Sequence, residues 1–202
     1  MRSQRLYIPL VEYRYEWLEL GRALIPLDWS RDGRFVLYRV RDLKNGWDVW
    51  AMDMEGRGSM PVLQTPFEDR SAQFSPNGGW LVYESNDSGR FEIYVQPFPR
   101  GNRRNVSTAG GSQPQWSADG GEIFYIAPDG YLMAVPVRTF PDDRPIELGQ
   151  PVRLFQAQVE GTVQGGITHT YVPSLDGQRF LMTTFVEQAG TPLTLVLNRG
   201  VR

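Results

Sequence analysis

The stretch "WSRDGRFVLY", residues 29–38, decides the fold of this chain because it recurs. "FSPNGGWLVY" begins at Phe74, "WSADGGEIFY" at Trp116, and a weaker copy, "PSLDGQRFLM", at Pro173. In each copy a Ser and then an Asp or Asn precede a Gly, and an apolar run follows. This order predicts a tight turn and then a strand, because Asx side chains hydrogen-bond within turns and Gly adopts the left-handed conformation. We therefore expect Asp32 to be a turn residue and not part of an acidic site.

The turn glycines give the period of the repeat. They stand 45, 42 and 57 residues apart, at Gly33, Gly78, Gly120 and Gly177. A period of about 40–45 residues is typical of a four-stranded propeller blade. The longer last interval contains "TFPDDRPIELGQP", whose prolines and charges predict a surface loop. The sequence thus predicts an all-β fold, a β-propeller of about four blades of four antiparallel strands, either closed or partial.

We expect a single β-propeller domain over residues 1–202, in which residues 1–23 are an N-terminal segment. Its blades are predicted at about 24–66, 67–110, 111–158 and 166–200. Within residues 1–23, "VEYRYEW" alternates apolar and charged residues as a half-buried strand does. The fourth copy ends before a fourth strand, so residues 6–17 are expected to supply it and close the ring. The alternative is that residues 1–23 are the remnant of an upstream blade.

Composition excludes several function classes. The chain has no Cys, which excludes disulfides, thiolate catalysis and Cys-ligated metals. Its 21 basic and 23 acidic residues nearly balance, so we expect no nucleic-acid partner. No apolar run approaches the roughly 18 residues of a membrane span, and the N-terminus lacks the apolar stretch of a signal peptide.

A search for catalytic motifs finds none. The sequence contains no G-x-S-x-G elbow, no Walker loop and no G-x-G-x-x-G. His169 is the single His, so a triad or a His-based zinc site lacks its partners. We therefore predict no enzyme, no catalytic residue, no metal site and no cofactor.

Beyond the repeat itself, two runs carry a family resemblance. The WS-x-D/N-G turns resemble PD40 repeats, the WD40-like propeller of TolB-type proteins. "SNDSGRFEIYVQPFP" and "GGSQPQWSADG" resemble the C-terminal propeller of bacterial eukaryotic-like serine/threonine kinases, over about residues 26–198. The resemblance implies a periplasmic or extracytoplasmic sensor propeller that follows a cytoplasmic kinase and a membrane span. This chain has no glycine-rich ATP loop, no HRD and no DFG, so the resemblance implies the sensor without the kinase.

The expected function is therefore a non-catalytic binding module whose ligand is a protein, a peptide or a glycan. In a propeller the inner strands and the residues before them line the channel, and their polar residues are the predicted ligand-binding set. This set is Asp28, Arg70, Gln73, Gln113, Gln115 and His169. The alternatives are the propeller domain of a prolyl-oligopeptidase-like peptidase and a glycan-active propeller. An incomplete ring would also favour a homo-oligomer.

Deleting residues 1–20 tests the ring-closing strand. We expect the deletion to lower the melting temperature of the whole domain in one cooperative transition, because an open sheet edge would remain. Thermal unfolding followed by circular dichroism measures this, and an unchanged melting temperature would contradict the assignment.

Overall fold

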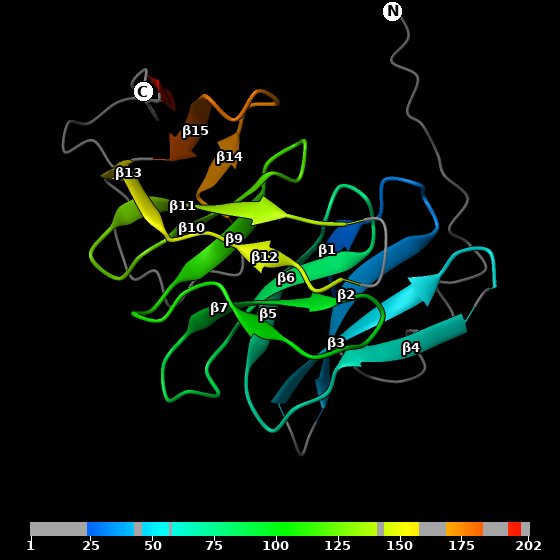
Figure 1. Cartoon of the computed structure of the whole chain (residues 1–202). Coiled ribbons are helices and arrows are strands. Elements are labelled where there is room, and N and C mark those ends of the chain that lie inside the picture. The colour runs from blue at the N-terminus through cyan, green and yellow to red at the C-terminus, as the bar shows by residue number, and fades with distance from the viewer. Residues whose placement is uncertain are drawn as a thin grey trace, which may run out of the picture.

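The computed structural model describes residues 24–42, 46–56, 58–140, 144–157, 169–183 and 194–198. These residues form sixteen β-strands in four antiparallel sheets, with no helix among them (Figure 1). No helix in this part of the chain is long and apolar enough to span a membrane. The expected ring-closing strand at residues 6–17 lies outside the described residues.

Each sheet follows the chain from its inner strand outward. The first sheet contains β1 (Leu24–Trp29), β2 (Phe35–Asp42), β3 (Gly46–Asp53) and β4 (Gly58–Leu63). The second contains β5 (Asp69–Phe74), β6 (Trp80–Ser85), β7 (Glu92–Pro97) and β8 (Arg104–Asn105). The third contains β9 (Ser112–Trp116), β10 (Glu122–Ile126), β11 (Tyr131–Arg138), β12 (Glu147–Leu148) and β13 (Val152–Gln156). The fourth contains β14 (Tyr171–Pro173), β15 (Arg179–Thr183) and β16 (Thr194–Asn198).

This arrangement confirms the predicted all-β propeller. In Figure 1 the sheets follow one another from the first, in blue and cyan, to the fourth, in orange and red. The inner strands β1 and β5 contact each other, as do β5 and β9. In the third sheet both β12 and β13 pair with β11, at different parts of that long strand.

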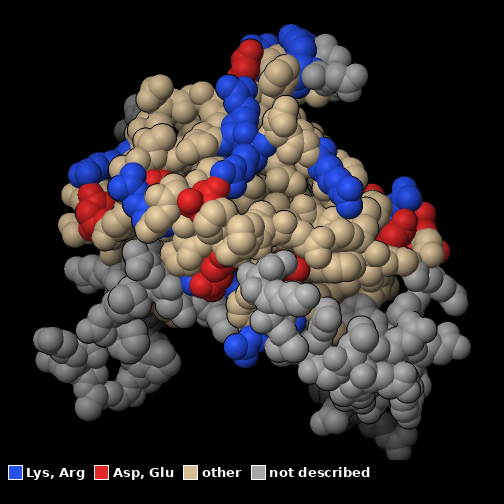
Figure 2. All heavy atoms as spheres, turned by 90° about the horizontal axis from the view of Figure 1, so that it is seen from below, with Lys and Arg blue, Asp and Glu red and all other residues tan. Residues whose placement is uncertain are grey.

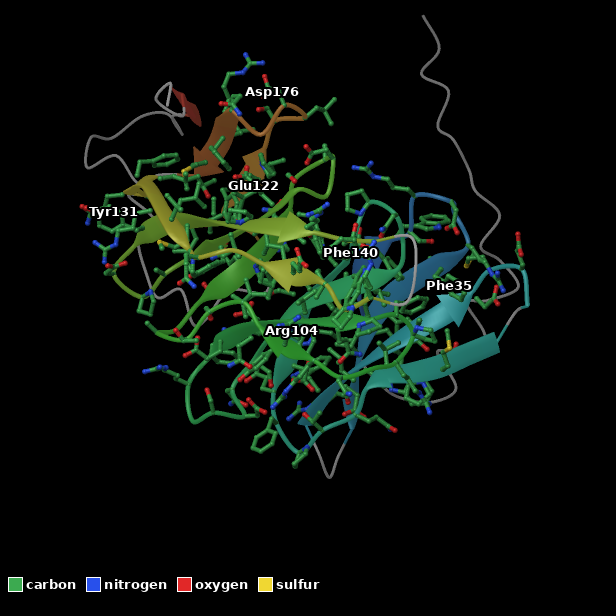
Figure 3. The ribbon with its side chains drawn as sticks, viewed as in Figure 1. Phe35, Arg104, Glu122, Tyr131, Phe140 and Asp176 are labelled. Carbon is green, nitrogen blue, oxygen red and sulfur yellow. The ribbon has the colours of Figure 1, made fainter. Side chains whose placement is uncertain are left out.

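The recurring turn between the first two strands of each sheet has one hydrogen-bond pattern. In the first sheet Ser30 Oγ donates to Asp32 Oδ1 at 2.6 Å, and Arg34 N donates to the same oxygen at 3.0 Å. Gly33 N then donates to Ser30 O at 2.9 Å, and Gly33 has a φ of 76°. The same pattern recurs at the other three turns, including Asp176, which Figure 3 labels between β14 and β15. These Asx side chains are turn residues, as predicted.

Apolar side chains fill the spaces between successive sheets. Position four after the turn Gly is fully buried in the first three sheets, at Leu37, Val82 and Phe124. Each of these packs into the core that its own sheet shares with the next sheet. Face-to-face packing of this kind is the main apolar contribution to a stack of sheets.

The insertion before the fourth sheet is more than a surface loop. It contains β12, and Ile146 within it is fully buried in the core between the second and third sheets. Arg104 Nη1, on β8, donates to Ile146 O at 2.5 Å and ties the insertion to the second sheet (Figure 3). The sequence did not predict this packing, because a single buried Ile among prolines and charged residues forms no periodic apolar pattern.

Equivalent positions are exposed at the two ends of the stack. Phe74 and Trp116 are 7% exposed, whereas Trp29, at the same place in the repeat, is 51% exposed. Leu181 is 46% exposed although its counterparts in the other sheets are buried. Trp29 is therefore not a core residue, although its counterparts Phe74 and Trp116 are. The reason is that, among the described sheets, none precedes the first and none follows the fourth.

Alanine substitutions of Leu37 and Leu181, which occupy the same repeat position, test the difference between a site inside the stack and a site at its end. We expect Leu37→Ala to lower the free energy of unfolding by about 2–5 kcal/mol, because it opens a cavity between two sheets. The matched change Leu181→Ala should stay within about 0.5 kcal/mol, since the side chain is half exposed. Urea unfolding of both variants measures this, and equal losses would show that the two sites are packed alike.

Candidate functional site

The inner strands of all four sheets end around one cavity of about 230 Å³. The position five residues before the turn Gly lines it in every sheet. These residues are Asp28, Gln73, Gln115 and Val172. The cavity therefore lies at the channel mouth that carries the recurring turns, and three of the six predicted ligand-binding residues meet there.

Asp28 joins the first two sheets at this mouth. Its Oδ2 accepts a hydrogen bond of 2.8 Å from Phe74 N, at the end of β5. Burial raises the pKa of Asp28, and the backbone hydrogen bond from Phe74 lowers it only in part. The carboxylate is thus partly dehydrated, which is costly for a charged group without an ion-pair partner.

Gln73 and Gln115, the two glutamines among these four cavity-lining positions, differ in their hydrogen bonds. The Gln115 side chain donates through Nε2 to Tyr171 O and so ties the third sheet to the fourth. The side chain of Gln73 makes no hydrogen bond with any other described residue. Among the polar side chains at these four positions, the Gln73 carboxamide is the group whose donors and acceptor are all available to a ligand.

Trp29 and Arg31 also line the cavity, and sequence reasoning did not assign them to the site. Trp29 Nε1 donates to Gly33 O at 2.9 Å, which fixes the indole while half of its surface stays exposed. Arg31 is exposed at the rim. No sequence signal could have separated Trp29 from its buried counterparts, because the residue type is the same as at Trp116.

The other three predicted residues do not line the cavity. Arg70, Gln113 and His169 lie seven or eight residues before their turn glycines, deeper along the inner strands. The Gln113 side-chain oxygen accepts hydrogen bonds from Thr170 N at 2.7 Å and Thr170 Oγ1 at 2.9 Å. His169 Nε2 lies 3.2 Å from Pro114 O, and burial lowers the pKa of its imidazole. The Gln113 and His169 side chains thus connect the third sheet with the segment that leads into the fourth, whereas Arg70 lies 3.4 Å from Glu84 of its own sheet.

Glu84, on β6, is the centre of this deeper cluster, and sequence reasoning did not assign it a role. Ser71 Oγ donates to Glu84 Oε1 at 2.5 Å, and Arg70 Nε lies 3.4 Å from Oε2. Burial raises the pKa of Glu84, although the charge of Arg70 opposes this. Ser71 and Gln113 hold positive φ values of 53° and 56°, which for residues other than Gly is strained backbone. The cluster couples the second, third and fourth sheets below the cavity.

Beyond the cavity the surface gives little sign of another site. Figure 2 shows basic and acidic side chains interspersed over one face of the molecule. Exposed pairs such as Arg153 and Asp129, 2.7 Å apart, contribute little to stability. In the part of the chain that the structure describes, no group of His, Asp and Glu side chains is arranged to hold a metal ion.

Antiparallel sheets repeated around a shared cavity define this chain as a β-propeller with a polar mouth. No family model matches the sequence. The Tol-Pal system protein TolB of a Polaromonas species is 34% identical to it over 66 residues, which are 33% of this chain and 16% of that protein. The similarity to TolB-type propellers is therefore supported by sequence over one third of the chain.

Two solved structures resemble the whole arrangement. TolB from Acinetobacter baumannii superposes with a TM-score of 0.64 at 17% identity, over 89% of this chain and 41% of that one. A puromycin-hydrolyzing peptidase of Mycobacterium tuberculosis gives a TM-score of 0.59 at 18% identity, over 81% of this chain and 28% of that one. The chain thus spans less than half the length of these proteins, and at such identities the likeness shows the fold alone.

Alanine substitutions of the two cavity-lining glutamines, Gln73 and Gln115, should lower the free energy of unfolding by different amounts. Gln115→Ala should lower the free energy of unfolding by about 1–3 kcal/mol, because it leaves the Tyr171 carbonyl without its donor. Gln73→Ala should stay within about 0.5 kcal/mol, since no protein group depends on it. Chemical denaturation of the two variants measures this, and a large loss for Gln73→Ala would mean that its amide has a structural role.

Proposed function

We propose that this chain is a non-catalytic binding module that takes part of a protein or peptide ligand into the channel-mouth cavity. The observation that carries the proposal is the convergence of four equivalent inner-strand positions on one cavity with an unpaired carboxamide and a half-exposed indole. Hydrogen-bonding groups held by rigid strands without partners of their own are what a binding site needs.

The size of the cavity favours a macromolecular ligand. Sites that enclose a whole small molecule usually have volumes of about 300–1,000 Å³. A cavity of about 230 Å³ is smaller and fits one or two side chains. The remainder of the ligand would then lie across the recurring turns, as a peptide or a protein loop does.

The cellular setting follows from resemblance. Likeness to the propeller of bacterial serine/threonine kinases supports a sensor role in an extracytoplasmic compartment, and likeness to TolB supports a protein partner. The structural likeness to a peptidase favours a second candidate, the propeller domain of a prolyl-oligopeptidase-like peptidase. The neighbouring reading frames distinguish them, since a kinase frame supports the first and a hydrolase frame the second.

Selection from a phage-displayed peptide library tests the binding site. We expect peptides whose dissociation constant rises at least about tenfold with Gln73→Ala and with Trp29→Ala, because each removes a contact worth about 1.4 kcal/mol. Isothermal titration of the selected peptides provides the measurement.

The matched control is Phe67→Ala, which removes an exposed aromatic that does not line the cavity. Its affinity for the selected peptides should equal that of the unchanged protein. Selected peptides that bind all three variants equally well, or a library that yields no binder, would contradict the proposed site.

A further inference from the structure

Two charged side chains line the cavity, and they differ in how they are placed. Asp28 is partly buried, and one of its carboxylate oxygens accepts a hydrogen bond from Phe74 N. Arg31 is exposed, and no ion pair joins it to Asp28 or to another described carboxylate. The partly buried charge at the cavity is therefore negative, and no cationic side chain among the described residues forms an ion pair with it.

Such a carboxylate is in an unfavourable position when the cavity is empty. Burial removes water from Asp28 and raises its pKa, and the backbone hydrogen bonds from Phe74 and Trp29 and, least of all, the charge of Arg31 offset this only in part. A cation that entered the cavity would replace the lost hydration with a short, charge-assisted hydrogen bond. An acidic group would instead meet a like charge in a poorly hydrated place.

Trp29 provides the second half of a cation site. It follows Asp28 directly and lines the same cavity. Its indole is held by the bond to Gly33 O and keeps half of its surface exposed. An aromatic face attracts cations, and it also covers the aliphatic stem of a long basic side chain. Gln73 offers a free carboxamide oxygen as a further acceptor.

Resting on the proposed function, we infer that the cavity selects a basic side chain, Lys or Arg, of the ligand. Asp28 is its counter-ion, Trp29 packs against its stem, and Gln73 accepts a hydrogen bond from its head group. Arg31, the other charged group at the mouth, competes weakly with the ligand for Asp28.

The probe is Nα-acetyl-lysine N-methylamide, compared with the uncharged norleucine analogue and the glutamate analogue. Binding is followed by the ¹⁵N–¹H signal of the Trp29 indole, assigned by its loss in Trp29→Phe. We expect the lysine probe to bind at least about tenfold tighter than the norleucine probe, and the glutamate probe more weakly than either.

Asp28→Asn is the decisive variant, because an Asn oxygen can still accept from Phe74 N and preserve the join between sheets. We expect it to remove the preference for lysine over norleucine while leaving the melting temperature nearly unchanged. Asp129→Asn, in an exposed pair with Arg153 far from the cavity, is the matched control and should keep the full preference. Arg31→Ala should keep or increase it.

The pH dependence provides an independent readout. Since burial raises the pKa of Asp28, its carboxylate gains a proton at a higher pH than an ordinary Asp. Affinity for the lysine probe should therefore fall as the pH is lowered through that pKa, and affinity for the norleucine probe should not. In Asp28→Asn both affinities should be independent of pH over this range.

Equal affinities for lysine and norleucine, no detectable binding of the lysine probe, or a preference that survives Asp28→Asn would each overturn this inference. The proposed function fails separately. Library peptides that depend on Gln73 and Trp29 but contain no Lys or Arg would retain the binding module and refute the basic ligand. A library with no cavity-dependent peptide would refute both.

Discussion

The packing of each sheet against the next is the constraint on which the rest of this structure depends. An antiparallel sheet with one apolar face must bury it, and here Leu37, Val82 and Phe124 do so at one repeat position. Because every sheet meets its neighbour through the same positions, the inner strands converge on a common space. The cavity at the channel mouth follows from that geometry, and its lining includes the residue that stands five positions before each turn Gly.

The polar side chains along the inner strands are of two kinds: those that hydrogen-bond to a neighbouring sheet and those that do not. Asp28 and Gln115 make hydrogen bonds to the neighbouring inner strand, and Glu84, on β6, accepts a hydrogen bond of 3.5 Å from Gln113 N on the next inner strand. Buried polar groups of this kind need hydrogen-bond partners, and here they find them in the neighbouring sheet. These bonds therefore hold the sheets together, and the atoms that make them are not free to bind a ligand. Among the described residues, Gln73 has no such bond, and no described sheet lies beside the exposed face of Trp29. These two residues and the second oxygen of Asp28 are the groups that the proposed ligand would use.

Much of the fold could be predicted, because its signals are local. The Ser–x–Asx–Gly turn is specified by short hydrogen bonds within six residues, and the strands after it by apolar runs. The binding role of the predicted site residues stays a prediction, and the structure shows which of them line the cavity. Topology placed six polar residues on the inner strands, and the cavity is lined by Asp28, Gln73 and Gln115. Arg70, Gln113 and His169 do not line the cavity, because a shift of two or three residues along the chain moves a side chain away from the mouth. Gln113 and His169 then make hydrogen bonds between the third and fourth sheets, and Arg70 pairs with Glu84 within the second.

By itself the sequence determined the repeat, the turn chemistry, the antiparallel sheets and the absence of cysteine chemistry, since each depends on neighbours in the chain. The tertiary structure alone decided that Gln73 is unpaired while Gln115 is bound, and that Trp29 is half exposed while Trp116 is buried. These residues occupy equivalent places in the repeat and have like side chains. What separates them is the backbone and the sheet that happen to lie beside each one, and those neighbours are fixed only when the four sheets pack together.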